Sequence, residues 1–487
     1  MSDHPDMQEA FSAAATEKLL AAQIQERVNA RDWTGVLTIY EQFDTELARP
    51  DRAAAVMNHA GVALHWLGRG AESRAQFTRA VRHVDRHKLL EGAALTARTL
   101  ELAVMAAMGA RDLAALKNLM TFKFRAFFAE PRDITVSPLK DLRAWCAENG
   151  VVIDEIEPAR DVVLDPSPTA HKMLHYRAEP YWTARIPGGQ IVAGWDFVAS
   201  PAGEVLTGAS YSGLEHTYAF MPHLYYPDLQ HVAHAWSDEP IAVDADVLHL
   251  GCPERFHHGH WLVDFLPRLL AWRRPDKIAV PENLPRKLRE TLTYFGVGPD
   301  DMVACAFAKR HRFRSVLVTH PGHYLIPNPT KVRFVAESFG WRPLEGDAPA
   351  RRRKVFLTRA LGTRNIVNRD EFDALLAEFD IETIDVARLS IAEQTQLFAE
   401  TGCVMGVFGS DLWAIYHMKP GTHVIELIWD EAVDQILIRA CVILQMKHEF
   451  FLCPVDQRPD DANRKVDRDI RVDCVRLRAH LAETLGK

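Results

Sequence analysis

The chain has 487 residues, of which 48% are hydrophobic and 25% are charged, with 26 glycines and 27 prolines. This composition is typical of a globular protein and excludes a disordered or fibrous chain. The length predicts about two to four domains of roughly 100–200 residues each. The 57 basic and 65 acidic residues give a net charge of −8, so no overall basic field attracts the chain to nucleic acid or to an anionic membrane.

The seven cysteines are scattered, odd in number and never spaced as Cys-x-x-Cys, which argues against a disulfide framework and against a zinc knuckle. The first 20 residues lack a basic stretch followed by an apolar core, and no run of about 18 uncharged apolar residues follows them. We therefore expect a cytoplasmic protein without a signal peptide or a transmembrane segment.

Residues 1–128 contain few prolines, and their apolar residues recur at intervals of three and four, which predicts amphipathic helices. Ala-Arg-Asp occurs at residues 30–32 and again at 110–112, with a third turn at 67–70 between them. The spacing of about 40 residues is close to that of a helix-hairpin repeat.

Three positions within this region resemble the small–aromatic–small pattern of a tetratricopeptide repeat, namely Gly61, Phe77 and Ala80. Small residues there would let two helices approach closely while the aromatic ring fills the groove between them. A plain helical bundle without repeat ancestry is the alternative. We predict a domain at 1–128 that binds a protein partner or a second copy of the chain.

Residues 129–180 are interrupted by prolines at 131, 138, 158, 166 and 168, which predicts a connecting region with short elements. Short strands are expected next at 184–187, 190–193 and 197–199, separated by Gly-Gly and Ser-Pro-Ala-Gly turns. They are typical of a small antiparallel cap at the start of a domain.

The rest of the chain alternates between apolar runs and helical periodicity. Strands are expected at 247–250, 277–280 and 315–318, and, after a hinge at 343–353, at 355–358, 381–384, 404–407 and 424–427. Helices are expected at 260–272 with a kink at Pro267, and at 284–295, 369–379, 391–400 and 410–418. This alternation predicts an α/β fold with parallel sheets in two Rossmann-like domains, 181–345 and 346–487, and a ligand in the cleft between them.

The densest group of reactive side chains lies at residues 255–268. His260 and Asp264 are four residues apart and share one face of a helix, so the carboxylate can fix the imidazole tautomer and raise its basicity, as a general base requires. Zinc binding is an alternative because three histidines precede this aspartate, but the adjacent His257 and His258 would point apart. A helix start with a capping histidine is a second alternative.

Two further groups follow predicted strands. Arg359 and Arg364 come after 355–358, where guanidinium groups can bind phosphate oxygens, although a solvated loop would have the same composition. Residues 406–412 predict a strand, a glycine turn and a helix start, whose N–H groups can bind a diphosphate or can simply accompany helix packing. Glu426, near the end of 424–427, could bind a ribose diol or serve the fold alone.

In this order the three groups resemble glycosyltransferase family 61 over about residues 180–455. The resemblance is carried by Gly259-His260-Trp261, Asp264 and Leu266-Pro267-Arg268-Leu269, by Arg359, Arg364 and Asn368, and by Gly406, Gly409, Pro420-Gly421-Thr422 and Glu426. It implies a GT-B enzyme with inverting chemistry, without a metal or a resident cofactor. The co-substrate would be a nucleotide sugar such as a UDP-sugar, and the acceptor a hydroxyl of a glycan or a protein.

The resemblance also implies roles for individual residues of this hexosyl- or pentosyltransferase. His260 or Asp264 would deprotonate the acceptor. Donor or acceptor would be bound by His258, Arg268, Arg359, Arg364, Asn368, Gly409, Ser410, Asp411 and Glu426.

Phe408, Asp411 and Ala414 depart from the family loop Gly-x-His-Gly-Ala-Gly-Leu-x-Asn, because they stand in place of its His, its last Gly and its Asn. Phe408 removes an imidazole near the donor, and Asp411 places a negative charge beside a diphosphate unless it caps the helix. These departures favour a second hypothesis, a catalytically degenerate transferase fold that acts as a scaffold through its helical repeats. The retained His260 and Asp264 favour an enzyme.

Overall fold

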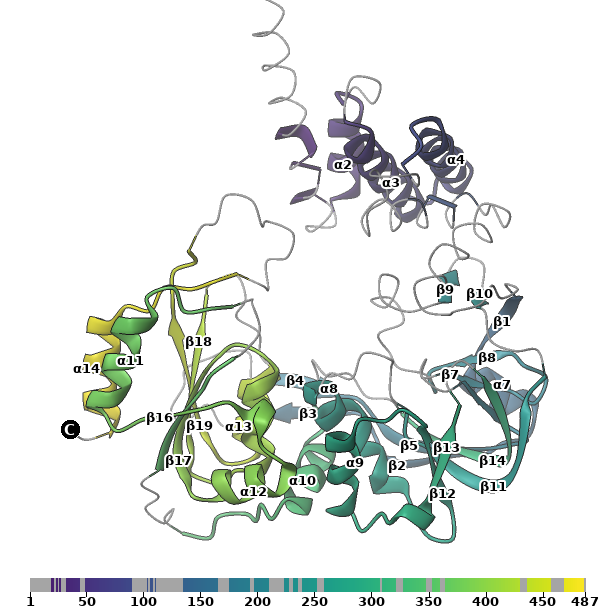
Figure 1. Ribbon diagram of the computed structural model, residues 1–487. Helices are drawn as coiled ribbons and strands as arrows, with labels where there is room; N and C mark the ends of the chain where they lie inside the picture. Colours follow the sequence, from purple (N-terminus) through teal and green to yellow (C-terminus); the bar gives the residue numbers. More distant parts are fainter. Residues whose placement is uncertain are drawn as a thin grey trace, which may run out of the picture. The chain divides into compact units, whose positions relative to one another are not determined.

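The structure is a computed structural model of the chain (Figure 1). It describes residues 19–21, 23–24, 26–27, 32–43, 49–89, 103, 106–107, 110, 135–164, 175–192, 197–209, 223–226, 231–234, 239–251, 258–306, 309–320, 327–346, 353–359, 364–429, 436–456 and 468–485. The chain divides into two compact units, a first unit of Met1–Pro138 with Gly213–Trp236 and a second unit of Leu139–Ser212 with Ser237–Lys487.

The first unit contains the helices α2 (Trp33–Tyr40), α3 (Pro50–Trp66) and α4 (Gly70–Arg86), and α3 and α4 form a hairpin (Figure 1). The Phe77 ring packs so tightly on Gly61 that a Cβ atom there would lie 2.8 Å from a ring carbon. The Ser73 hydroxyl also donates to the Gly61 carbonyl at 2.8 Å. The predicted contact between a small residue and an aromatic ring is therefore present, while membership of the tetratricopeptide family stays a prediction.

The other two turns predicted for the repeat, at 30–32 and 110–112, lie largely outside the described residues. The first unit also contains a short antiparallel sheet. In it β10 (His231–His234) pairs with β9 (His223–Tyr226) and with Thr135–Pro138, the first residues of β1 (Thr135–Asp141).

The second unit begins with a mixed sheet. Its parallel part runs in the order β13 (Met302–Cys305), β12 (Lys277–Pro281), β11 (Ile241–His249) and β14 (Arg310–Thr319). β14 also pairs antiparallel with β5 (Tyr181–Pro187) and β6 (Gln190–Val192). The strands expected to form a separate cap therefore continue the same sheet.

Three short strands extend this sheet: β7 (Phe197–Ala199) pairs with β6, β8 (Val205–Thr207) pairs with β7, and β2 (Ile153–Glu157) pairs with β5. β3 (Arg160–Val163) and β4 (His175–Ala178) form a separate two-stranded antiparallel sheet. The remaining elements of this half are α7 (Leu142–Glu148), α9 (Arg286–Thr293), the 3₁₀ turn η5 (Pro299–Asp301) and α10 (Pro329–Ser338).

A second sheet is parallel throughout, in the order β16 (Glu382–Ile384), β15 (Arg353–Leu357), β17 (Thr401–Val407), β18 (His423–Ile428) and β19 (Lys447–Leu452). Its central strands are buried on both faces, as their continuous apolar runs predict. Phe372 of α11 (Arg369–Glu378) and Leu477 of α14 (Cys474–Leu485) belong to the core on one face. α12 (Ile391–Ala399) and α13 (Ile436–Ile443) cover the other, and η6 (Val386–Arg388) precedes α12 (Figure 1).

Each sheet has one position where the chain reverses the direction in which it adds strands. In the second sheet the order, counted along the chain, is two-one-three-four-five, so the reversal lies between β15 and β17. In the first it lies between β11 and β14. The carboxyl ends of strands flanking such a reversal form a crevice in which α/β proteins bind ligands.

The strands predicted between 247 and 427 are all confirmed, whereas two of the helices are not regular α-helices. The predicted helix 260–272 is an α-turn α8 (His258–His260), a π-helical turn η3 (Trp261–Phe265) and a 3₁₀ turn η4 (Leu266–Ala271), because Pro267 cannot donate the hydrogen bond that a continuous helix needs. The predicted helix 410–418 is the 3₁₀ helix η7 (Ser410–His417). None of the helices in the described part of the chain combines the length and apolar character needed to cross a membrane.

Candidate active site

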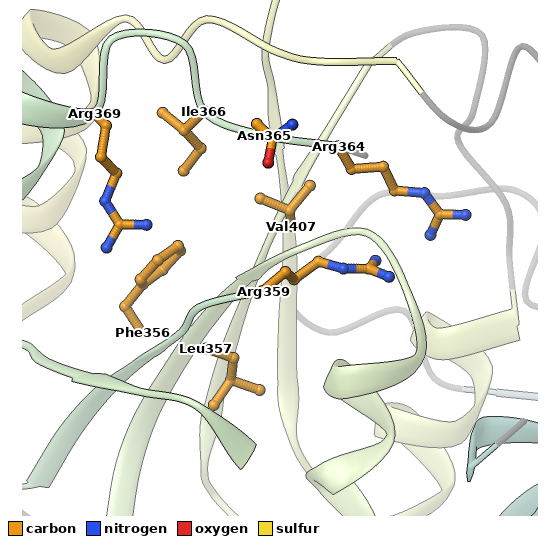
Figure 2. A pocket seen from close by; sticks show the side chains of 8 residues that line it. All are labelled: Phe356, Leu357, Arg359, Arg364, Asn365, Ile366, Arg369 and Val407. Atoms are coloured by element: carbon orange, nitrogen blue, oxygen red, sulfur yellow. The ribbon is translucent and has the colours of Figure 1, made fainter. Parts of the chain in front are cut away.

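A pocket opens at the carboxyl ends of β15 and β17, where the second sheet reverses its strand order (Figure 2). Its lining residues come from the ends of both strands, from the loop after β15 and from the start of α11: Phe356, Leu357, Arg359, Arg364, Asn365, Ile366, Arg369 and Val407. Three of these eight residues are arginines, so the pocket is suited to an anion.

Arg359 and Arg364 reach the same carbonyl group. Their Nη1 atoms donate to the Phe408 oxygen at 3.3 Å and 3.0 Å, respectively. The next residue is Gly409, with φ of 150°, and a Cβ atom there would clash with Arg359 Nη1 and lie 2.8 Å from Arg364 Nη1. The predicted glycine turn is therefore what allows the two guanidinium groups to converge.

Phe408 replaces the histidine of the family loop and contacts the second of these arginines. The Arg364 guanidinium carbon lies 5.1 Å from the centre of the Phe408 ring, within the range of a cation–π interaction. The ring itself stands edge-on to Trp429, with 5.9 Å between centroids. An aromatic contact thus holds Arg364 at this position.

Asp411 lies in the first turn of η7, where Gly409 rather than Asp411 is the N-cap residue. Its carboxylate lies 3.6 Å from Arg359 Nε. Burial raises the pKa of Asp411, and the positive charges of Arg359 and Lys287 oppose that shift. The negative charge of Asp411 is thus opposed by the positive charges of Arg359 and Lys287, which come from different halves of the second unit.

His260 and Asp264 form the hydrogen-bonded pair that their spacing predicts. His260 Nδ1 lies 2.7 Å from Asp264 Oδ2, with the Asp264 side chain 2% exposed and the His260 side chain 39% exposed. A carboxylate beside Nδ1 accepts a hydrogen bond from the Nδ1–H group, so the ring proton stays on Nδ1 and the basic lone pair lies on Nε2. The π-helical turn that carries Asp264 is a distortion often found at functional sites.

A contact between η7 and the short helix α8 links this pair to the second half of the unit. A Cβ atom on Gly259 would lie 2.5 Å from Cδ1 of Trp413. The indole therefore packs directly on the backbone next to His260. Trp261 is anchored in turn, because its Nε1 donates to Thr291 Oγ1 at 2.8 Å.

His258 and Arg268 lie on either side of this pair in the chain. Both ring nitrogens of His258 are buried and have no hydrogen-bond partner among the described residues, and burial lowers the pKa of this imidazole to about 4. The ring is therefore neutral at pH 7. Arg268 is 2% exposed, with Nη1 3.3 Å from Nδ1 of His249 at the end of β11.

Two predicted site residues are not among those that line the arginine pocket. Asn368 donates to the Val472 carbonyl at 2.8 Å and accepts from the Val472 N–H at 3.0 Å. Glu426 lies 2.9 Å from His448 Nε2 on the neighbouring strand, with both side chains almost completely buried. Ser410 begins η7 directly after the glycine turn.

Several residues of the site were not predicted, chiefly Arg369, Asn365, Trp413 and Lys287. Arg369 stacks on Phe356 at 5.4 Å and points away from the other two arginines (Figure 2). Its position in the sequence, soon after Arg359 and Arg364, could have indicated that it belongs to the same pocket. No sequence pattern indicated Trp413 or Lys287, because their places in the site depend on contacts between the two halves of the second unit. Within the described residues, no three His, Cys, Asp or Glu side chains are grouped to hold a metal ion.

Residues 258–425 match the family model described as Glycosyltransferase 61. The match supports assignment to glycosyltransferase family 61. It begins at His258 and includes the histidine–aspartate pair, both convergent arginines and the glycine turn. This family match supports glycosyltransferase activity, with a sugar donor and an acceptor as substrates. No curated protein matches the chain.

Proposed function

We propose that this protein is an inverting, metal-independent glycosyltransferase that moves a sugar from a nucleotide sugar, such as a UDP-sugar, to a hydroxyl of a glycan or a protein. Its two Rossmann-like domains would have the GT-B arrangement. The observation that carries the proposal is the convergence of Arg359 and Arg364 on Phe408 at a strand-order reversal, next to a helix in contact with the His260 segment.

The arginine pocket supports the donor half of the proposal. Arg359 and Arg364 supply guanidinium donors beside the start of η7, and guanidinium groups next to a helix N-terminus are a combination that binds phosphate. As the bond between the sugar and the diphosphate breaks, negative charge develops on the departing diphosphate. Fixed cations stabilise that charge without a metal ion.

The His260–Asp264 pair supports the acceptor half. His260 Nε2 would take the proton of the acceptor hydroxyl as its oxygen bonds to the anomeric carbon, and the nucleoside diphosphate would leave from the opposite face. This single displacement inverts the anomeric configuration. Asp264, held at 2.7 Å, would stabilise the imidazolium that forms.

The donor site is tested by calorimetric titration of the protein with UDP, GDP and CMP, repeated on Arg359→Ala and Arg364→Ala. A hydrogen bond to a charged group contributes about 1.5–3 kcal/mol, so each substitution should raise the dissociation constant of the preferred nucleotide about tenfold or more. Unchanged affinity in both variants would move the donor site elsewhere.

The base is tested by turnover of the same donor with an acceptor hydroxyl. We expect His260→Ala to reduce kcat by about 10²–10⁴, the usual contribution of a general base, with nucleotide affinity retained. Asp264→Asn should reduce kcat less, because the imidazole remains. A greater loss in Asp264→Asn would make Asp264 the base, and parental rates in both variants would exclude both residues.

We also propose that residues 1–128 bind the acceptor protein or a second copy of the chain. Helical hairpins such as α3–α4 stack into extended surfaces that bind proteins. The test is a chain beginning near Pro131. If it keeps full activity towards a protein acceptor and the same assembly state in light scattering, the proposal is wrong.

A further inference from the structure

The segment 468–472, which precedes α14, runs beside the loop 364–368 that carries one of the convergent arginines. It lies outside the region matched by the family model, 258–425. Asp469 Oδ1 accepts hydrogen bonds from the backbone N–H and the side-chain Nδ2 of Asn365, at 2.8 Å and 2.9 Å. The Ile470 N–H donates to the Asn365 carbonyl at 2.9 Å, and the Val367 N–H donates to the Ile470 carbonyl at 3.0 Å.

These bonds act at a strained point of the backbone. Arg364 has φ of +59°, a left-handed conformation that costs free energy for any residue other than glycine and persists only where its surroundings impose it. The N–H group that follows this residue, that of Asn365, is the one bound by Asp469. The Asp469 residue is 7% exposed, so water competes little for its carboxylate.

We propose that Asp469 is a positioning residue for Arg364, an inference that rests on the proposed function of the arginine pocket. Asp469 fixes the peptide after Arg364, which holds the left-handed turn and directs the guanidinium to the Phe408 carbonyl at 3.0 Å. The nucleotide site is then incomplete without the segment that follows the matched region.

Two substitutions separate positioning from a merely structural contribution of this segment. Asp469→Asn keeps an Oδ1 acceptor for Asn365, whereas Asp469→Ala removes it. Asp473→Ala is the matched control, because Asp473 directly follows the segment and its Oδ1 accepts from the Arg476 N–H at 3.0 Å. If Asp469→Ala acted only by loosening the segment, Asp473→Ala would have the same effect.

The first measurement is the calorimetric affinity for UDP, with donor KM and kcat measured alongside. Asp469→Ala should raise the UDP dissociation constant and the donor KM about tenfold, as loss of one charge-assisted contact does, and should lower kcat no further than Arg364→Ala does, because both substitutions act through the same guanidinium group. Asp469→Asn and Asp473→Ala should bind UDP as the parent does. If Arg364→Ala weakens UDP binding and Asp469→Ala does not, the positioning role is refuted while the proposed donor site stands.

The second measurement needs no nucleotide. Phenylglyoxal modifies accessible guanidinium groups, and peptide mass spectrometry gives the rate at Arg364 itself. We expect faster modification in Asp469→Ala than in the parent, Asp469→Asn or Asp473→Ala. Equal rates in all four proteins would refute the inference. If UDP affinity is unaffected by Arg364→Ala but the labelling rates differ as expected, the proposed donor site fails and the positioning of Arg364 by Asp469 stands.

Discussion

Gly409→Ala is the substitution for which the structure gives the most direct consequence. The new Cβ atom would clash with Arg359 Nη1 and lie 2.8 Å from Arg364 Nη1. Both guanidinium groups must then withdraw from the Phe408 carbonyl. The backbone is also affected, because φ at this residue is 150° and few residues other than glycine adopt that value.

The size of the effect follows from the number of donors displaced. One hydrogen bond to a charged group contributes about 1.5–3 kcal/mol, and about 1.4 kcal/mol corresponds to a tenfold change in affinity. Displacement of both arginines should therefore raise the nucleotide dissociation constant by about 10²–10⁴. The backbone strain should lower the free energy of unfolding by about 1–3 kcal/mol.

The assay pairs calorimetric nucleotide binding with urea unfolding of the same samples. Gly296→Ala is the matched control, since Gly296 has φ of +74° but a Cβ atom there would meet nothing within 4 Å. The control should lose a similar amount of stability and bind nucleotide like the parent. Parental nucleotide affinity in a folded Gly409→Ala protein would refute the arginine arrangement described here.

Three further substitutions test other parts of the chain. Phe77→Ala should destabilise the α3–α4 hairpin by about 3 kcal/mol, because the ring fills the groove over Gly61; urea unfolding followed by circular dichroism measures this loss. Gly259→Ala should reduce kcat with nucleotide affinity retained, because the new methyl group would displace Trp413 beside the His260–Asp264 pair, and an unchanged kcat would contradict this. Burial lowers the pKa of Lys331 to about 8 from 10.5, so between about pH 8 and 10 the unfolded chain binds a proton that the folded chain does not. Urea unfolding should accordingly show the parent gaining stability relative to Lys331→Met as the pH rises through that window, and a falling or constant difference would be contrary to this reasoning.

Strands that are buried on both faces can be predicted from sequence, because burial on both faces requires a continuous apolar run. β17 and β18 are of this kind. β19 was missed, since Lys447–Leu452 begins with polar and charged residues whose burial depends on partners elsewhere. His448 is buried there only because Glu426 of the adjacent strand lies 2.9 Å from it. Such pairings cannot be read from either strand alone.

The residues of the candidate site also divide into those that the sequence predicts and those whose positions depend on distant partners. Spacing predicted the His260–Asp264 pair, because both residues lie within one helical segment and their contact is local. The order of strands and loops also placed Arg359 and Arg364 at a carboxyl edge. It could not give the direction of the Asn368 side chain, whose partner Val472 lies 104 residues further along the chain. The contact between Gly259 and Trp413 was equally inaccessible, since it depends on how two halves pack.

The departures at Phe408 and Asp411 can be weighed by what their side chains contact. The Phe408 ring cannot form the hydrogen bonds of the histidine in the family loop. The Phe408 carbonyl, however, accepts hydrogen bonds from both arginines, and its ring packs against Arg364. Asp411 adds one negative charge, yet it lies 3.6 Å from Arg359 and near Lys287, while Arg364 and Arg369 also line the pocket or its rim. Arg369 is also paired with Asp373 at 2.8 Å, and Asp385 adds a second negative charge near Asp411, so the positive character of the pocket rests on Arg359 and Arg364. The two arginines therefore keep their convergent arrangement, and the two substitutions by themselves give no reason to regard the fold as a catalytically degenerate scaffold.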